Sequence, residues 1–418
     1  MDTHRELVFY RLLLWLLWVP LFLYTAWQAL KACESSYLRQ RFGLYQANKG
    51  AAPFWFHAAS VGEVNALLPL IETVRKHHPD RPLLVTTTTI SGAQAARKKL
   101  SAGVMHAWLP IDYPYAVRRF LITHQPRCAV ILETELWPHL YASCRAHEIP
   151  LLLVNGRLSA RTLRAPQWLR RLYHYTLRQV TAIFARAEAD RLGFIALGAD
   201  GAHVSVVGNI KFAAAPRAEA VSALELGRRY ILAASTRDGE EKLIIDAWEK
   251  SGITDCLLVI APRHPQRLRD ILRDTGKHAV AVRSRNEPVT PDTTIYIADT
   301  FGELPALMLG AEMVIMGGSL VPKGGQNLLE PAALGKAIVF GPHMENFSSE
   351  TAILLNEEGA IQVNDSDALA ASLSSLMQDG ARRESLGKNA RAAVDARRDM
   401  AARYYQALLP WCGSTSPS

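Results

Sequence analysis

The sequence is poor in cysteine. Its 418 residues include five cysteines, which are widely spaced and form no Cys-x-x-Cys pair. An odd number at such spacing supports neither a disulfide framework nor a zinc site, and it favours a reducing compartment. The sequence also lacks a His-Glu-x-x-His motif, a Gly-x-Ser-x-Gly elbow and the lysine-bearing phosphate loop of ATPases. These absences argue against several common enzyme sites, and we expect no metal ion in the chemistry.

Charge is missing from one long stretch, Leu12 to Leu30, which is rich in Leu and Trp. As one helix this stretch would be about 28 Å long, close to the hydrocarbon thickness of a bilayer. More Lys and Arg residues follow it than precede it, which predicts that the rest of the chain is cytoplasmic. We expect residues 1–31 to form an uncleaved membrane anchor that spans the bilayer or lies in its interface.

Three other interpretations of this segment compete with an anchor. A cleaved signal peptide is disfavoured because the apolar run is long and no small-x-small site ends it. Residues 30–33, Leu-Lys-Ala-Cys, resemble a lipoprotein cleavage site, but a lysine two residues before the cysteine is unusual there. A buried core helix is the third alternative.

The remaining chain alternates short apolar stretches with amphipathic ones, which predicts an α/β fold. The alternation restarts after a segment poor in strand formers, between Gly208 and Arg229, and the length also favours two domains. We therefore predict two tandem Rossmann-like, doubly wound domains, at residues 32–212 and 213–418. The predicted strands are 54–58, 83–88, 104–109, 129–132, 151–154, 182–185 and 204–207, then 230–234, 256–261, 279–282, 294–298, 313–316, 337–340 and 360–363.

A glycine-rich segment, residues 317–342, follows the predicted strand 313–316. Gly317 and Gly318 permit a tight turn, Gly325 opens a second one, and an apolar helical pattern follows. The start of that helix would offer unpaired amides to a phosphate, and Glu330 would reach ribose hydroxyls. An ordinary α/β crossover, in which the glycines only form the turns between strands and helices, explains the segment about as well.

Acidic and basic side chains follow several predicted strands. Glu63 comes after the first strand and is a candidate general base, or a carboxylate that stabilises the start of its helix. Glu133 and Glu135 follow the fourth strand, where they either border the same cleft or stabilise the start of the helix that begins at Pro138. Lys211 at the domain boundary and Arg263 after a strand of the second half suit a phosphate, although a lone lysine is more often a solvated one. Arg157 and Arg161 belong to a basic cluster that either holds acceptor phosphates or forms a solvated helix face.

Together these segments resemble the 3-deoxy-D-manno-octulosonic acid (Kdo) transferases of Gram-negative lipid A assembly, and the resemblance covers nearly the whole chain. It implies a glycosyltransferase-B fold and an inverting, metal-independent transfer of Kdo from CMP-Kdo to the distal glucosamine of a lipid A precursor. It also implies no cofactor beyond this donor, no nucleic-acid partner and a place on the cytoplasmic face of the bacterial inner membrane. The segments that carry it are 57–63, 133–138, 209–212, 235–241, 262–265, 299–304 and 317–342.

The resemblance also implies residue roles. Glu63 falls on the catalytic base of the family, and Glu133 and Lys211 fall on residues that stabilise the transition state. The family's CMP contacts correspond to Pro262, Arg263, Gly302, Glu303, Leu304, Asn327, Leu328, Leu329 and Glu330.

Three positions depart from the family pattern, namely Arg237, Gln326 and Ala213, and they bear on details of nucleotide and sugar contact. Two alternative functions remain open at this point. One is a UDP-sugar-dependent transferase that acts on another lipid, and the other is a non-catalytic, membrane-bound nucleotide-binding protein. The motifs carry no information on oligomeric state.

Overall fold

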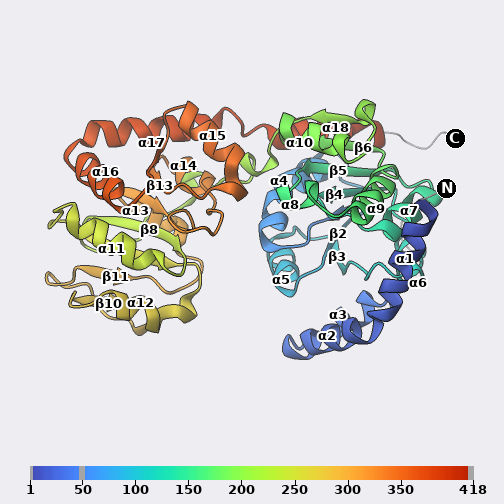
Figure 1. Cartoon of the computed structure of the whole chain (residues 1–418), viewed down its shortest axis with the longest axis horizontal. Coiled ribbons are helices and arrows are strands. Elements are labelled where there is room, and N and C mark those ends of the chain that lie inside the picture. The colour runs from blue at the N-terminus through green and yellow to red at the C-terminus, as the bar shows by residue number, and fades with distance from the viewer. Residues whose placement is uncertain (1–2, 47–51, 413–418) are drawn as a thin grey trace. The chain divides into compact units, whose positions relative to one another are not determined.

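The computed structural model describes residues 3–46 and 52–412 (Figure 1). These residues form two compact units. The first comprises the described residues up to Ala214 and from Asp399 onward, and the second comprises Ala215 to Arg398.

The first domain is built on a parallel sheet of seven strands in the order β3-β2-β1-β4-β5-β6-β7. The direction of winding reverses between β1 and β4, and this switch point is where α/β proteins bind ligands. The strands are β1 (Phe54–His57), β2 (Leu83–Thr87), β3 (Val104–Trp108), β4 (Cys128–Leu132), β5 (Leu151–Gly156), β6 (Ala182–Ala185) and β7 (Val204–Val206). The helices between them are α4 (Val61–His77), α5 (Ile90–Lys99), α6 (Pro114–His124), α7 (Pro138–Ala146), α8 (Ala160–Leu163), α9 (Gln167–Leu177) and α10 (Glu188–Ala196).

The second domain repeats this plan, with seven parallel strands in the order β10-β11-β9-β8-β12-β13-β14. Its switch point lies between β8 and β12. The strands are β8 (Tyr230–Thr236), β9 (Leu257–Pro262), β10 (Val280–Val282), β11 (Ile295–Ile297), β12 (Met313–Met316), β13 (Ala337–Phe340) and β14 (Ile361–Gln362). The helices are α11 (Glu240–Lys250), α12 (Leu268–Asp274), α13 (Leu304–Gly310), α14 (Leu329–Ala333), α15 (Ser348–Asn356), α16 (Ser366–Gln378) and α17 (Gly380–Asp395).

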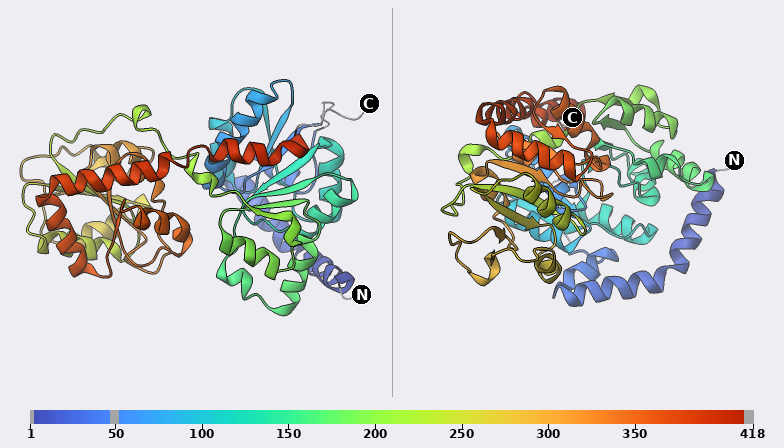
Figure 2. Two further views of the ribbon diagram at one scale, coloured as in Figure 1. Left: turned by 90° about the horizontal axis from the view of Figure 1, so that it is seen from above. Right: turned by 60° about the vertical axis from the view of Figure 1, so that its left-hand side comes forward.

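Both faces of each sheet are covered by helices, as expected for strands that are apolar throughout (Figure 2). In β1, Phe54 and Phe56 pack into one buried cluster with α4, whereas Trp55 packs into a second cluster on the other face. Alternate side chains of a strand point to opposite faces, so a strand buried on both sides loses the usual polar alternation. The predicted α/β fold with two doubly wound parallel sheets is confirmed.

The C-terminal helix α18 (Met400–Cys412) belongs to the first domain, not to the second as the predicted range 213–418 assumed. Tyr404 is fully buried in the core of the first domain, and its hydroxyl donates to the carbonyl of Gly208 at 2.7 Å. The single final helix expected from Arg382 onward is therefore two helices, because the chain turns after α17 and returns to the first sheet.

The charge-free segment near the N-terminus forms two helices, α1 (Thr3–Leu16) and α2 (Trp18–Lys31), and α3 (Ser35–Arg41) follows. In the described part of the chain no single helix has the length and apolarity to cross a membrane, but the pair Leu7–Leu16 and Trp18–Lys31, bent by 58°, does when taken together. The continuous helix expected over Leu12–Leu30 is thus wrong. Pro20 explains the break, because it cannot donate to the carbonyl four residues earlier and its ring clashes there.

Candidate active site

The two acids predicted from the first half lie on either side of its switch point. Glu63 is in the first turn of α4, directly after β1, and Glu133 directly follows β4. Since β1 and β4 are neighbouring parallel strands, their carboxyl ends meet at one edge of the sheet. Both side chains line one cavity of about 390 Å³. Its walls are formed by Glu63, Glu133, Thr134, Glu135, Leu136, Trp137, Arg157, Ser159, Thr162 and Tyr173.

Glu63 is held by two hydrogen bonds from the residues that precede α4. One carboxylate oxygen accepts from the Ala59 amide at 2.8 Å, and the other accepts from the Ser60 hydroxyl at 2.8 Å. The Ser60 hydroxyl in turn accepts from the Glu63 amide. Burial raises the pKa of Glu63 above its ordinary value, while the bonds from Ala59 and Ser60 oppose the rise. The carboxylate therefore has a fixed direction and an increased affinity for a proton.

Glu133 is held between two cations. Its carboxylate lies 2.8 Å from the Lys211 ammonium and 3.8 Å from the Arg157 guanidinium. Lys211 comes from a short 3-10 turn (Ile210–Phe212), and its amide donates to the Asn209 side chain at 3.0 Å. Glu133 has a φ of 58°, in the left-handed region that a non-glycine residue adopts only when its surroundings fix it. Such backbone strain at a strand end is typical of a functional position.

Glu135 is a third acid of the same cavity, and the sequence placed it beside the cleft without assigning it a role. Burial, followed by the charge of Glu63, raises the pKa of Glu135 to about 7. Its carboxylate accepts from the Trp137 indole at 3.0 Å, and its backbone carbonyl accepts from the Tyr141 hydroxyl at 2.6 Å. The Glu-x-Glu spacing after β4 places both acids on one loop.

The two basic candidates for acceptor binding differ in position. Arg157 lines the cavity, whereas Arg161 is exposed on α8 and is not among the lining residues. Tyr173, on α9, is a lining residue that the sequence-based set did not include. A role for Arg161 in binding stays a prediction.

The predicted nucleotide contacts of the second domain follow the carboxyl ends of its strands. Pro262 ends β9 and Arg263 is exposed immediately after it. Glu303, just before α13, pairs with Arg283 at 2.6 Å, which lowers the pKa of Glu303. Gly302 has a φ of 92° and begins the turn into α13, and Leu304 is the first residue of that helix. Contact of these residues with a nucleotide stays a prediction.

The second group of nucleotide candidates surrounds α14. Asn327 caps this helix, because its carbonyl oxygen accepts from the Leu329 amide at 3.1 Å while its amide donates to Glu330 at 3.1 Å. Leu328 and Leu329 are buried, so their side chains belong to the core. Only their backbone groups offer polar contacts to a ligand.

The three glycine amides predicted to bind a phosphate already have acceptors in the structure, and phosphate binding by them stays a prediction. The Gly317 amide donates to Ala234 at 2.8 Å, the Gly318 amide to Glu240 at 2.5 Å and the Gly325 amide to Gly318 at 2.7 Å. A phosphate would have to displace these acceptors. The expected helix is also only five residues long and already capped, so it offers little dipole at its start.

Glu240 is the residue that organises this turn, and the sequence-based set did not include it. Its side chain is completely buried at the start of α11. Besides Gly318, its carboxylate accepts from the amides of Ser319 and Leu320, both at 2.9 Å, and of Arg237 at 2.8 Å. Glu240 therefore joins the loops that follow β8 and β12, the two strands at the switch point.

Among residues 3–46 and 52–412, no three His, Cys, Asp or Glu side chains group as metal ligands would. An Asp-x-Asp pattern, which can bind a metal in other transferases, occurs at Asp365 and Asp367. Asp365 caps α16 through the Ala368 amide at 2.8 Å, and Asp367 pairs with Lys250 at 2.8 Å, so structural contacts account for both. A metal-free reaction remains a prediction.

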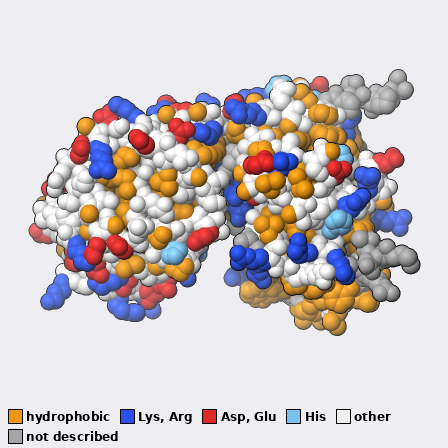
Figure 3. Space-filling view, turned by 45° about the horizontal axis from the view of Figure 1, so that its top comes forward, with side chains coloured by type: hydrophobic (Ala, Val, Ile, Leu, Met, Phe, Trp, Pro, Cys, Tyr) orange, Lys and Arg blue, Asp and Glu red, His pale blue; other side chains and the backbone are white. Residues whose placement is uncertain are grey.

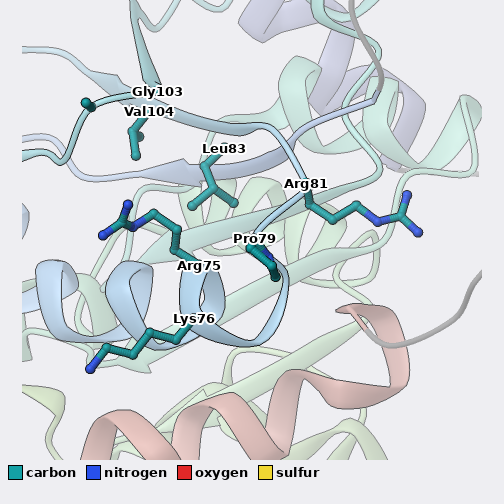
Figure 4. A pocket seen from close by; sticks show the side chains of 8 residues that line it. Arg75, Lys76, Pro79, Arg81, Leu83, Gly103 and Val104 are labelled. Atoms are coloured by element: carbon teal, nitrogen blue, oxygen red, sulfur yellow. The ribbon is translucent and has the colours of Figure 1, made fainter.

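A second cavity, of about 330 Å³, lies where β2 and β3 begin, at the sheet edge opposite to the acids (Figure 4). Arg75, Lys76 and Arg81 are among its lining residues. We assign no step of the chemistry to it.

The chain is similar to known proteins in sequence and in fold. Residues 36–214 match the family model described as 3-Deoxy-D-manno-octulosonic-acid transferase (kdotransferase). The chain is 33% identical to the 3-deoxy-D-manno-octulosonic acid transferase of Bordetella pertussis, over 87% of this chain and 88% of that protein. It is 30% identical to the Haemophilus influenzae protein of the same name, over 90% of this chain and 91% of that protein. Among solved structures, UDP-GlcNAc 2-epimerase from Neisseria meningitidis has a TM-score of 0.61 and 12% identity, over 86% of this chain and all of that one, which shows a shared fold alone.

Proposed function

The chain belongs to the family of 3-deoxy-D-manno-octulosonic acid (Kdo) transferases, and we propose that it moves Kdo from CMP-Kdo to the distal glucosamine of a lipid A precursor. It is thus a glycosyltransferase of lipopolysaccharide synthesis. The observation that carries the proposal is the convergence of Glu63, Glu133 and Lys211 at one switch point, within the part of the chain that matches the family model.

In the proposed reaction, Glu63 is the general base for the acceptor hydroxyl. The hydroxyl oxygen attacks the anomeric carbon of Kdo as its proton passes to the Glu63 carboxylate. The bond from that carbon to the phosphate oxygen breaks, and its electron pair leaves with CMP. A positioned general base is worth about 10² to 10⁴ in rate, and the Ser60 and Ala59 bonds supply that position.

The cations have the complementary role. Negative charge grows on the phosphate of CMP as the bond breaks, so fixed cations stabilise the transition state more than the ground state. We assign this role to Lys211, and Arg263 stays a predicted contact of the nucleotide. Glu133 fixes the direction of the Lys211 ammonium at 2.8 Å and so reduces the reorganisation that the reaction requires.

We further propose that the reaction needs no divalent metal and that the enzyme works at the cytoplasmic face of the inner membrane. Support for the membrane comes from the charge-free residues 12–30 and from the excess of Lys and Arg after them.

The test uses purified full-length protein with a tetraacylated lipid A precursor, offered CMP-Kdo or a series of UDP-sugars, with and without EDTA. We expect product only with CMP-Kdo and the same rate with EDTA. Transfer from a UDP-sugar alone would contradict the donor, and no transfer from any donor despite nucleotide binding would favour a non-catalytic protein. Loss of activity in EDTA that magnesium restores would contradict the metal-free reaction.

A further inference from the structure

The helices α1 and α2 present an apolar face outward. Six large apolar side chains on these helices are each at least 54% exposed, and we call them the apolar face. They are Leu12, Trp15, Leu16, Leu23, Trp27 and Leu30. Figure 3 shows hydrophobic side chains gathered at the lower right of the view, over these helices. Soluble proteins seldom expose so many large apolar side chains together without a partner for them. We infer that the two helices lie in the plane of a lipid leaflet and dock the protein on it without crossing it.

The opposite side of α1 is fixed to the first domain. The Tyr10 hydroxyl donates to Asp112 at 2.9 Å, and Asp112 is only 2% exposed. The Tyr113 hydroxyl donates to the Leu14 carbonyl at 2.8 Å. Lifting α1 off the domain would leave the Asp112 carboxylate with one partner fewer and would break the packing of Leu14, so this face is an interior one.

The inner side of α2 is covered as well. Ala29 is buried in a cluster with Tyr37 of α3 and Trp108 of β3. Thr25 is 3% exposed and its hydroxyl donates to the Leu21 carbonyl at 2.6 Å. Both helices therefore have one packed face and one exposed face, the pattern of helices that lie at a membrane surface.

Length gives the second argument against a span. Each helix has 14 residues, or about 21 Å at 1.5 Å per residue, against a hydrocarbon thickness of about 30 Å. The two would have to straighten their 58° bend, and α1 would have to leave the domain, before together they could cross. Lying in the plane requires neither change.

The charge of the segment identifies the occupant as an anionic lipid surface. Residues 7–33 contain no Asp or Glu but include Arg11 and Lys31, one in each helix. The Lys31 ammonium lies 5.3 Å from the centre of the Trp27 ring. Cations beside indole rings suit the headgroup level of a leaflet that carries negative charge.

The same helices contact elements of the candidate active site, and this step rests on the proposed function. Phe9 of α1 packs edge-on against Trp168 of α9 at 5.7 Å, and α9 also carries Tyr173, which lines the cavity. Asp112, which holds Tyr10, also accepts from the His139 and Leu140 amides at the start of α7. Docking on a leaflet thus holds the acceptor cavity beside the lipid that it uses.

Cysteine labelling tests the topology. Cys33 is the exposed cysteine among those in the described part of the chain, and the others there are buried. In full-length protein, a Thr3→Cys substitution combined with Cys33→Ser reports the start of α1, and native Cys33 reports the end of α2. With a membrane-impermeant maleimide, we expect both sites to react in inverted inner-membrane vesicles and neither in intact spheroplasts. Reaction of the Thr3→Cys protein from outside the spheroplasts would overturn the proposal.

A charge substitution tests the surface itself. Leu16 and Leu30 are 78% and 77% exposed, so changing both to Glu leaves the packed face intact. We expect binding to phosphatidylglycerol vesicles to fall at least ~10-fold, and turnover of a water-soluble, deacylated acceptor to stay unchanged. Leu192→Glu, at a 55% exposed site on α10, is the matched control and should bind as wild type does. Unchanged vesicle binding of the double variant would refute the lipid assignment. So would a wild-type dimer that the double substitution dissociates while vesicle binding is unaffected, because the apolar face would then bind a second copy of the chain. Absence of Kdo transfer with intact binding would count against the proposed function alone.

Discussion

The Ser60 hydroxyl donates to the Glu63 carboxylate at 2.8 Å and accepts from the Glu63 backbone amide. This reciprocal pair serves two purposes, since it starts α4 and it also aims the carboxylate into the cavity between β1 and β4. The capping role and the catalytic role that the sequence left as alternatives are therefore compatible in one side chain.

Removing that hydroxyl should shift the pH dependence of the reaction. The bond from Ser60 lowers the pKa of Glu63, so Ser60→Ala should raise it further. A general base works only when deprotonated, so the acid limb of kcat/KM should move to higher pH while the rate at high pH changes little. The loss of the cap should also cost about 1 kcal/mol of stability. Thr89→Ala removes a comparable cap from α5 and should lower stability without moving the pH profile.

Lys211→Met should reduce kcat by about 10², because it removes a fixed cation whose benefit grows as charge develops on the leaving phosphate. Measured by steady-state kinetics, KM for the donor should change much less than kcat. Lys99→Met is the control, since Lys99 is bonded to Asn65 on the surface of the same domain. A KM effect with unchanged kcat would show that Lys211 contributes to binding alone.

Glu135 should contribute an ionisation near neutral pH. Its pKa of about 7 arises from burial and from the charge of Glu63, so the wild-type kcat/KM profile should contain a transition near pH 7. In Glu135→Gln this transition should disappear and the acid limb should move to lower pH. A transition near pH 7 that persists in the variant would assign it to another group.

Glu240→Gln should weaken the glycine turn of the second domain. The Gln amide group would face backbone N–H donors that a carboxylate now satisfies. We expect a lower melting temperature and at least ~10-fold weaker CMP binding, measured by calorimetry. The exposed Glu384→Gln, in the same domain, should alter neither. If Glu240→Gln binds CMP as tightly as the wild-type protein does, this turn has no part in nucleotide binding.

Much of the fold followed from the sequence because parallel strands covered on both faces are continuous apolar runs. Strands such as Met313–Met316 and Ala337–Phe340 occur at the predicted residues. The errors came from long-range packing and from local backbone bonds. Nothing local in the sequence shows that Tyr404 returns to the first sheet. The apolar pattern of residues 12–30 favours one continuous helix, which Pro20 interrupts.

The residues that line the candidate site were predictable where they follow strand ends, and less so where distant side chains contact them. Glu63, Glu133 and Arg157 come together because strand ends of a parallel sheet share one edge, which the order of elements already implies. The acceptors of the glycine amides could not be predicted, because a turn with free amides has the same sequence pattern as a turn whose amides are bound by a distant carboxylate. That carboxylate, Glu240, lies 78 residues before Gly318.

The most direct measurement is the turnover of Glu63→Gln with CMP-Kdo and a lipid A precursor, with CMP affinity measured on the same sample. Gln keeps the size of the side chain and can still accept one of its two hydrogen bonds, but it cannot take a proton. Our account predicts that turnover falls by at least ~10² while CMP binding stays close to wild type, and that Glu72→Gln on the same helix changes neither. Turnover equal to wild type in Glu63→Gln would contradict the role of this residue as the base.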